Sequence, residues 1–238
     1  MKALPFPCIR PVPNHAPTLA SLPPHALRDR AELQGRLKAG ELVEDRNLGY
    51  YLYELAHDGK ASTAVITVCP LTAYEDGTVD AGELTPDDDA VRIETEHLVT
   101  LGCQMQPAVL SYPDQPVLDM IVGAAKTSSP VYLMENASGD RQAIWEVTRR
   151  EAVDALRAML GQIPCARLRG GINHVDAARR FAQDERQKAQ FAGTLTGKEP
   201  FNFLLTALVP ESGISGLPHV QGEAELPLGC LLSHRVAK

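Results

Sequence analysis

The residues best suited to chemistry form one short stretch, Gly170-Gly171-Ile172-Asn173-His174, in which paired glycines lead into a predicted helix. Asn173 is expected to cap that helix through its carboxamide, with Asp176 reaching back to a free backbone N–H. Glycines let a ligand approach the backbone closely, and a helix N-terminus presents unpaired N–H groups to an anion. The stretch predicts a phosphate site, and an ordinary glycine turn between a strand and a helix is the open alternative.

Three other places carry side chains that could act on a ligand. Glu83 and the acids of the helix start, Asp87, Asp88 and Asp89, could bind Mg²⁺ through water or remain a solvated helix start. Arg92 could face a phosphate or pair with a neighbouring acid. His234-Arg235 follows an apolar run, and it could line a site or lie in an exposed tail. Cys165, just before the glycines, is expected to be a buried strand cysteine rather than an activated thiolate.

Helices and hairpins must position these residues. Thr85 and Pro86 predict a helix start with acids in the first turn, and Gly102 predicts its end. A capping box at Thr148 predicts a further helix. Helices are expected at Arg28–Ala39, Thr85–Leu101, Val117–Lys126, Thr148–Leu160 and from the glycines to near Gly193; strands are expected at Tyr50–Leu55, Ser62–Cys69, Ala108–Tyr112, Val131–Met134, Ala143–Val147, Phe201–Val209 and Leu226–Ser233.

Turn-forming residues at His57-Asp58-Gly59 and Ser138-Gly139-Asp140 predict two hairpins. Hairpins mixed with helices predict an α/β class fold of the α+β kind, with a mixed sheet. Residues 1–24 hold seven of the 18 prolines and are expected to be an extended lead-in to a single compact unit, residues 1–238.

Composition narrows the function classes. The 238 residues carry a net charge of −7, which argues against a nucleic-acid-binding surface. No apolar run approaches the roughly 20 residues of a membrane span, and the N-terminus lacks the apolar core of a secretory signal. The five cysteines are scattered, with no two at metal-ligand spacing. A cytoplasmic protein without a resident metal and without a membrane or nucleic-acid partner is expected.

An ordered series of short motifs runs along nearly the whole chain. It comprises Pro5-Phe6, Arg10-Pro11, Leu22–His25, Gly40–Asp45 with Tyr51–Glu54, Glu83–Pro86 with Arg92, Pro107–Tyr112 and Leu231–Arg235. This series resembles the domain of unknown function 1015 family, a bacterial and archaeal group. Several positions depart from the family pattern: the Tyr-Asp pair expected after Pro24 is missing, Gly82 stands at a histidine, and Gln106 stands at a serine.

The family's hallmark, A-D-G-H-H-R-Y-x-A-A, resembles motifs of the ParB and sulfiredoxin superfamily, in which related folds bind a nucleoside triphosphate. Aligning Ala177-Ala178 places Gly170 at the aspartate and His174 at the arginine. A one-residue shift would place His174 at a histidine instead, and in either case both the aspartate and the arginine are missing. Phosphoryl transfer needs a carboxylate and a cation on the transferring group. Because both motif residues are missing, the site could still bind an anion although it has lost catalysis.

The resemblance implies a ParB/sulfiredoxin-like core in residues 140–238 with an N-terminal extension of hairpins and helices. It also implies a small-molecule or nucleotide ligand, ATP or another nucleotide with Mg²⁺, bound with weak or lost catalysis. An active serine-type kinase would need Glu83 as base with Arg92 or Arg235 as clamp, and His174 is the other catalytic candidate. A non-enzymatic binding or scaffold protein is the third alternative. The phosphate-binding residues expected are Gly170, Gly171, Asn173, His174, Arg92, His234 and Arg235.

Overall fold

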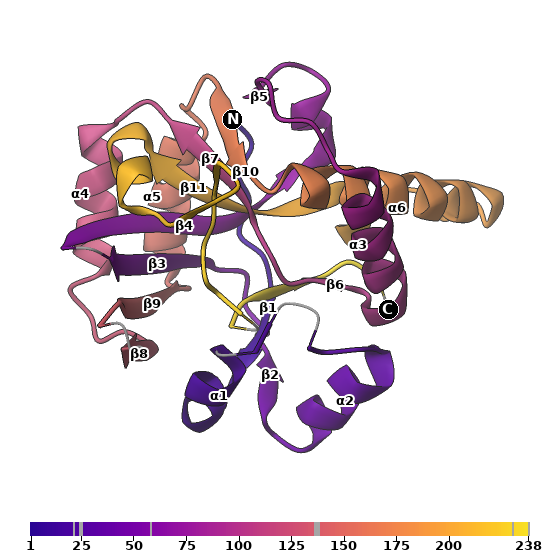
Figure 1. The fold of residues 1–238 in the computed structure, drawn as a ribbon, viewed down its shortest axis with the longest axis horizontal. Coiled ribbons are helices and arrows are strands. Elements are labelled where there is room, and N and C mark those ends of the chain that lie inside the picture. The colour runs from indigo at the N-terminus through magenta and orange to yellow at the C-terminus, as the bar shows by residue number, and fades with distance from the viewer. Residues whose placement is uncertain (21, 24–25, 58, 136–138, 230, 238) are drawn as a thin grey trace.

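An eight-stranded mixed sheet forms the centre of the molecule (Figure 1). The computed structural model describes the whole chain except residues 21, 24–25, 58, 136–138, 230 and 238. The strands in sheet order are β5 (Val79–Asp80), β10 (Ala166–Gly170), β7 (Ala108–Tyr112), β11 (Phe203–Pro210), β4 (Lys60–Pro70), β3 (Tyr50–His57), β9 (Arg141–Val147) and β8 (Tyr132–Glu135). β5 and β10 pair in parallel, as do β7 and β11, whereas the other pairs are antiparallel. The predicted mixed sheet is therefore confirmed.

A smaller sheet joins the two ends of the chain. Its order is β2 (Leu42–Glu44), β1 (Cys8–Pro11), β14 (Ser233–Arg235) and β6 (Cys103–Gln104). β14 lies between β1 and β6, and Cys8 is opposite His234. A separate hairpin of β12 (His219–Val220) and β13 (Glu223–Ala224) stands outside both sheets. The C-terminal segment thus contributes both to the small sheet and to a hairpin beside the glycine turn.

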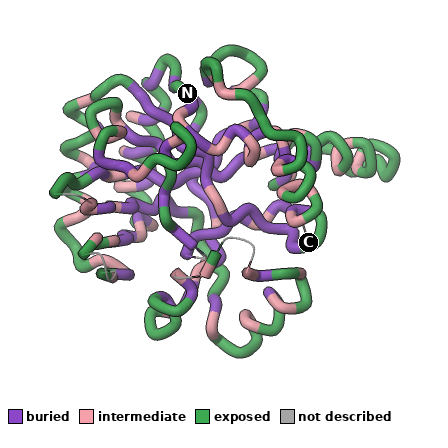
Figure 2. Tube along the Cα trace, viewed as in Figure 1, coloured by how far each residue is buried: buried purple, intermediate pink, exposed green. Residues whose placement is uncertain are grey.

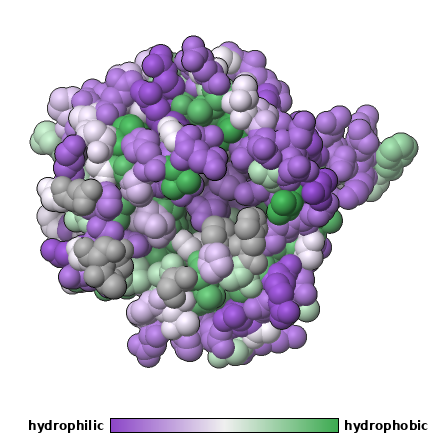
Figure 3. Space-filling model, in the orientation of Figure 1, coloured by the Kyte–Doolittle hydropathy of each residue, from purple (hydrophilic) through white to green (hydrophobic). Residues whose placement is uncertain are grey.

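The helices are α1 (Ala16–Ala20), α2 (Arg30–Lys38), α3 (Asp88–Leu101), α4 (Pro116–Ala125), α5 (Arg150–Leu160) and α6 (Ile172–Phe191), with 3-10 turns η1 (Pro13–His15), η2 (Leu71–Tyr74), η3 (Pro200–Asn202) and η4 (Glu211–Gly216). α3 packs along α6, and α4 packs on α5. The outer half of α6 projects from the body as an arm (Figures 1 and 2). Phe191 at its end is 95% exposed, and Figure 3 shows a hydrophobic tip on this mainly hydrophilic arm.

Both faces of the central sheet are buried, which explains its nearly continuous apolar strands. Along β11, Leu204 and Leu208 pack with the four helices α3 to α6 in one core. Leu205 and Ala207 point the other way, into a second core closed by the N-terminal segment and the loop before β14. Figure 2 shows the buried strands inside a shell of exposed helix surfaces. No helix in the described residues is long and apolar enough to cross a membrane.

The expected elements are largely present, but several boundaries were wrong. α3 begins at Asp88 with Asp87 as its cap rather than Thr85, because a contact from α6 holds the Asp87 amide. Among the described residues no side chain caps α5, whose N-cap is Arg149, so the capping box at Thr148 does not form. The expected strand Leu226–Ser233 is not one: Pro227 and Gly229 interrupt it, its leucines are buried, and pairing starts only at Ser233.

Two further expectations need correction. The proline-rich lead-in contains the short helix α1 as well as β1, so it is not extended throughout. Cys165 is exposed rather than buried, because β10 begins one residue after it. Asp58 and Ser138, from the two hairpin turns, lie outside the described residues, as does Cys230, although the strands that the turns connect pair as expected.

Candidate functional site

The glycine turn brings the end of β10 to the start of α6, but its geometry differs from the expected cap. Gly171 occupies the N-cap position with φ +84°, a left-handed conformation that favours glycine. Asn173 is the second helical residue, so the prediction that Asn173 caps α6 with Asp176 in support was wrong. Its carboxamide oxygen instead accepts a 2.8 Å hydrogen bond from the Asp87 amide and so ties α6 to the start of α3.

Packing within the protein, rather than the approach of a ligand, explains why a glycine is needed at position 170. A Cβ added to Gly170 would overlap the carbonyl oxygen of Ala224 on β13. The β12–β13 hairpin therefore packs directly onto the first glycine. It carries Glu223, whose carboxylate accepts a 2.6 Å hydrogen bond from the Gly171 amide. An internal anion thus already takes one of the N–H groups at the start of α6.

The next three amides of α6 are differently placed. The first intrahelical bond of this turn runs from the Val175 amide to the Gly171 carbonyl. Within the part of the chain that the structure describes, no protein acceptor takes the amide hydrogens of Ile172, Asn173 or His174. Such N–H groups at the positive end of the helix dipole favour a negatively charged partner.

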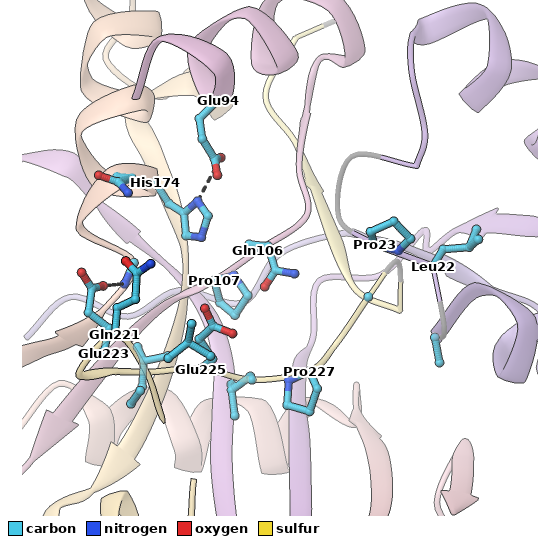
Figure 4. A pocket seen from close by; sticks show the side chains of 18 residues that line it. Leu22, Pro23, Glu94, Gln106, Pro107, His174, Gln221, Glu223, Glu225 and Pro227 are labelled. Atoms are coloured by element: carbon cyan, nitrogen blue, oxygen red, sulfur yellow. Dashed lines mark hydrogen bonds and ion pairs between the residues drawn. The ribbon is translucent and has the colours of Figure 1, made fainter. Parts of the chain in front are cut away.

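A contact with Glu94 fixes the orientation of the His174 ring. Its Nδ1 lies 2.9 Å from a carboxylate oxygen of Glu94 on α3, and both side chains are largely buried, at 23% and 21% exposed. Since the carboxylate accepts a hydrogen from Nδ1, the neutral ring has its lone pair on Nε2. Figure 4 shows the ring of His174 reaching from Glu94 toward Gln106. This is how a carboxylate orients a histidine that accepts protons.

These groups border a cavity of about 630 Å³ (Figure 4). Its walls come from α3, the start of α6, the segment before β7, the β12–β13 hairpin, and Ala20, Leu22 and Pro23. The polar side chains that line it are those of Glu94, Gln106, Asn173, His174, Gln221, Glu223 and Glu225. Asn173 and His174 thus both lie at the wall of a cavity.

The charge of the cavity wall is mostly negative. Three carboxylates line it, from Glu94, Glu223 and Glu225, and the described lining residues include no lysine or arginine. In the described residues, no group of three or more His, Cys, Asp or Glu side chains could hold a metal ion by itself. A bare phosphate would therefore meet three like charges on one side and the amides of α6 on the other.

Two predicted residues lie away from this cavity. Glu83 is exposed in a turn before α3 and does not line it. Arg92 is on the outer side of α3, where it pairs with Glu96 at 3.1 Å and with Asp89 at 3.6 Å. Arg92 therefore forms surface ion pairs with neighbouring acids, which was the alternative to a phosphate-binding role.

His234 and Arg235 were expected to join the phosphate site, but they line a different cavity. Arg235 pairs with both carboxylate oxygens of Glu44, at 2.8 and 3.0 Å. The Nε2 of His234 donates to the Pro200 carbonyl at 3.3 Å, and burial lowers the pKa of its ring to about 4. Of the expected site residues, only Gly171, Asn173 and His174 line the cavity, with Gly170 directly behind them.

Glu94 was missed at the sequence level, although the sequence contains a signal for it. Residues 91, 94, 98 and 101 fall on one face of a helix, and Val91, Leu98 and Leu101 are buried there. A carboxylate on an apolar helix face must find a partner. Glu223 and Glu225 carry no such signal, because the hairpin that brings them to α6 depends on tertiary packing.

The comparisons with known proteins gave one match. The family model described as "Protein of unknown function (DUF1015)" matches residues 17–216. No significant match was found among curated proteins, and none among solved structures.

Proposed function

Since the chain belongs to the DUF1015 family, whose description assigns no activity, we propose a function from the cavity itself: it binds a small molecule whose phosphate group faces the first amides of α6. The observation that carries this proposal is the set of three amides, at Ile172, Asn173 and His174, for which the described residues offer no acceptor, beside a cavity of about 630 Å³. That volume lies within the range of small-molecule sites. The relation to ParB and sulfiredoxin folds remains a prediction from the sequence.

The acidic wall sets a condition on that ligand. Glu223 and Glu225 would repel a bare phosphate, whereas a phosphate that carries Mg²⁺ brings compensating positive charge. Mg²⁺ commonly binds one or two carboxylates together with substrate phosphates, so it needs no cluster of protein ligands. The residues present therefore fit a nucleotide or phosphate ester bound with Mg²⁺ better than a free anion.

Isothermal titration with ATP, ADP and CTP, each with and without Mg²⁺, tests the proposal. We expect binding in the millimolar range or tighter with Mg²⁺, and at least about tenfold weaker binding without it, which corresponds to about 1.4 kcal/mol. Glu223→Gln keeps the shape of the side chain and removes one negative charge, so it should reduce the dependence on Mg²⁺. Arg92→Ala, which removes an exposed ion pair outside the cavity, is the matched control. Absence of millimolar binding under all conditions would contradict the proposal.

A specific observation favours a second candidate, phosphoryl transfer to a hydroxyl group. The Glu94–His174 pair can accept the proton of an attacking hydroxyl at Nε2, a role for which Glu83 was the sequence-level candidate. In a kinase assay with serine and other small hydroxy compounds, His174→Gln and Glu94→Gln should abolish turnover. Glu83→Gln, in an exposed turn, should leave it unchanged. Turnover that survives in His174→Gln would remove this candidate.

The third alternative, a non-enzymatic binding or scaffold protein, has a simple thermal test. A ligand that binds only the native state raises the free energy of unfolding by RT ln(1 + [L]/Kd) and therefore raises the melting temperature. If no nucleotide or phosphate compound raises it, the cavity has no such ligand and the scaffold alternative is favoured.

A further inference from the structure

The second cavity, which holds His234 and Arg235, differs from the first in size and character. It has a volume of about 810 Å³ and lies between residues 4–7, β14, the middle of α6 and the segment 198–203. Four of the five phenylalanines in the chain line it: Phe6, Phe181, Phe201 and Phe203. Leu4, Val68, Val99 and Val236 extend the apolar wall. Three of these rings are nearly buried, with Phe6 1%, Phe181 3% and Phe201 8% exposed, so they form the back of the cavity wall.

The floor of this cavity carries no charge near neutral pH. His234 is 4% exposed, its ring meets Phe6 edge-on at 5.7 Å between centroids, and its Nε2 hydrogen is bound to Pro200. Burial holds the pKa of the ring well below neutrality. An apolar group can therefore occupy the floor without covering a charge.

The rim carries four basic and three acidic side chains among the described residues. Each acid already has a partner: Glu44 pairs with Arg235, and Glu185 accepts from Lys188 at 2.6 Å. Glu199 accepts from Asn202 at 2.9 Å and from the Thr196 hydroxyl at 2.7 Å. The Lys198 ammonium has no ion-pair partner in the described chain, and the neighbouring Glu199 keeps its negative charge because both of these donors are neutral. With four basic and three acidic side chains, the described rim has one net positive charge above an apolar cavity.

We propose that this cavity binds a small amphiphile, a molecule with an apolar body and a single anionic group. The apolar body would lie against the phenylalanines, and the anionic group would remain at the rim next to Lys198. Removing the apolar body from water supplies most of the binding free energy, and the rim charge selects the sign of the head group. This site is separate from the cavity at the start of α6, and the proposal does not depend on the function proposed for that cavity.

Titration with dodecanoate, kept below micelle formation, against dodecyltrimethylammonium tests both parts of the proposal. The two probes share the same tail and differ in the sign of the head group. We expect dodecanoate to bind about three- to fivefold more tightly, the size of a partly exposed ion pair. Lys198→Glu should reverse that preference. Equal affinities for the two probes, or a preference that Lys198→Glu leaves unchanged, would overturn the proposal.

Val99→Trp locates the probe within the structure. Val99 lies on α3 at the cavity edge and is 52% exposed, so a larger side chain can fill the opening without disturbing a core. Dodecanoate affinity should fall at least about tenfold, with an unchanged melting temperature. His174→Gln, in the other cavity, should leave the affinity unchanged. Unchanged affinity in Val99→Trp would place the probe elsewhere and refute the assignment.

A second copy of the chain is the competing occupant, because Phe191 projects from the next turns of α6. Sedimentation at several protein concentrations distinguishes it. A dimer that excludes dodecanoate and is lost in Phe191→Ser would assign the cavity to the second copy and overturn the proposal. A monomer that binds dodecanoate supports it.

Discussion

Protonation of His234 should destabilise the fold as the pH falls, and the size of this effect follows from the burial of the ring. The pKa of the ring is about 4 in the folded chain and near its ordinary value of 6.5 when unfolded. Between these values the unfolded chain binds more protons than the native chain, so the free energy of unfolding decreases as the pH falls. From pH 7 to pH 5 the loss is about 2 kcal/mol, and it levels off below about pH 4. Desolvation is the main cause, since one bond to the Pro200 carbonyl opposes it only in part.

Urea unfolding of the wild type and of His234→Gln at pH 7, 6 and 5 measures this effect. The glutamine amide can still donate to the Pro200 carbonyl, but it does not titrate, so the free energy of unfolding of the variant should depend less on pH. At pH 7 this free energy should be lower than that of the wild type. Subtracting the two series removes the contributions of the carboxylates that both proteins share. The difference between wild type and variant should shrink by about 2 kcal/mol between pH 7 and pH 5. Parallel curves for the two proteins would refute the reasoning.

The remaining stability predictions concern the glycine turn and a buried ion pair. Gly170→Ala should lower the melting temperature by several degrees, because overpacking against Ala224 costs about 1–3 kcal/mol. Gly123→Ala, with open space at its Cβ in α4, should stabilise the protein and is the control; a neutral Gly170→Ala would contradict the close approach. Arg10→Met removes a 2.8 Å pair with Asp45, whose side chain is 9% exposed, and should cost about 3 kcal/mol in urea unfolding. A loss below about 1 kcal/mol would show that the pair behaves as a surface contact.

The fold could be predicted from the sequence wherever local pattern and tertiary packing agree. The strand at Ala108–Tyr112 and the helix that ends at Gly102 in a left-handed conformation were read correctly from apolar runs and glycine. Helix starts were harder, because several residues near each start can cap and a distant contact selects among them. At α3, the contact from Asn173 selects Asp87.

The candidate site was predictable only in part, for a related reason. The glycine turn marks where α6 starts, so Gly171 and His174 could be found from the sequence alone. The partner of His174 comes from another helix, and Glu223 arrives on a hairpin whose position no local pattern specifies. His234 was predicted to join the phosphate site, but it lines the other cavity. The order of motifs along the chain does not indicate which side of a sheet the residues of a strand face.

A crystal structure with Mg²⁺ and ADP soaked into the crystal tests the central claim most directly. The account predicts a phosphate group within hydrogen-bond distance of the amides of Ile172, Asn173 and His174, with Glu223 displaced from the Gly171 amide or bridged to the phosphate through the metal. An empty cavity at millimolar nucleotide, with Glu223 still bound to Gly171, would contradict it.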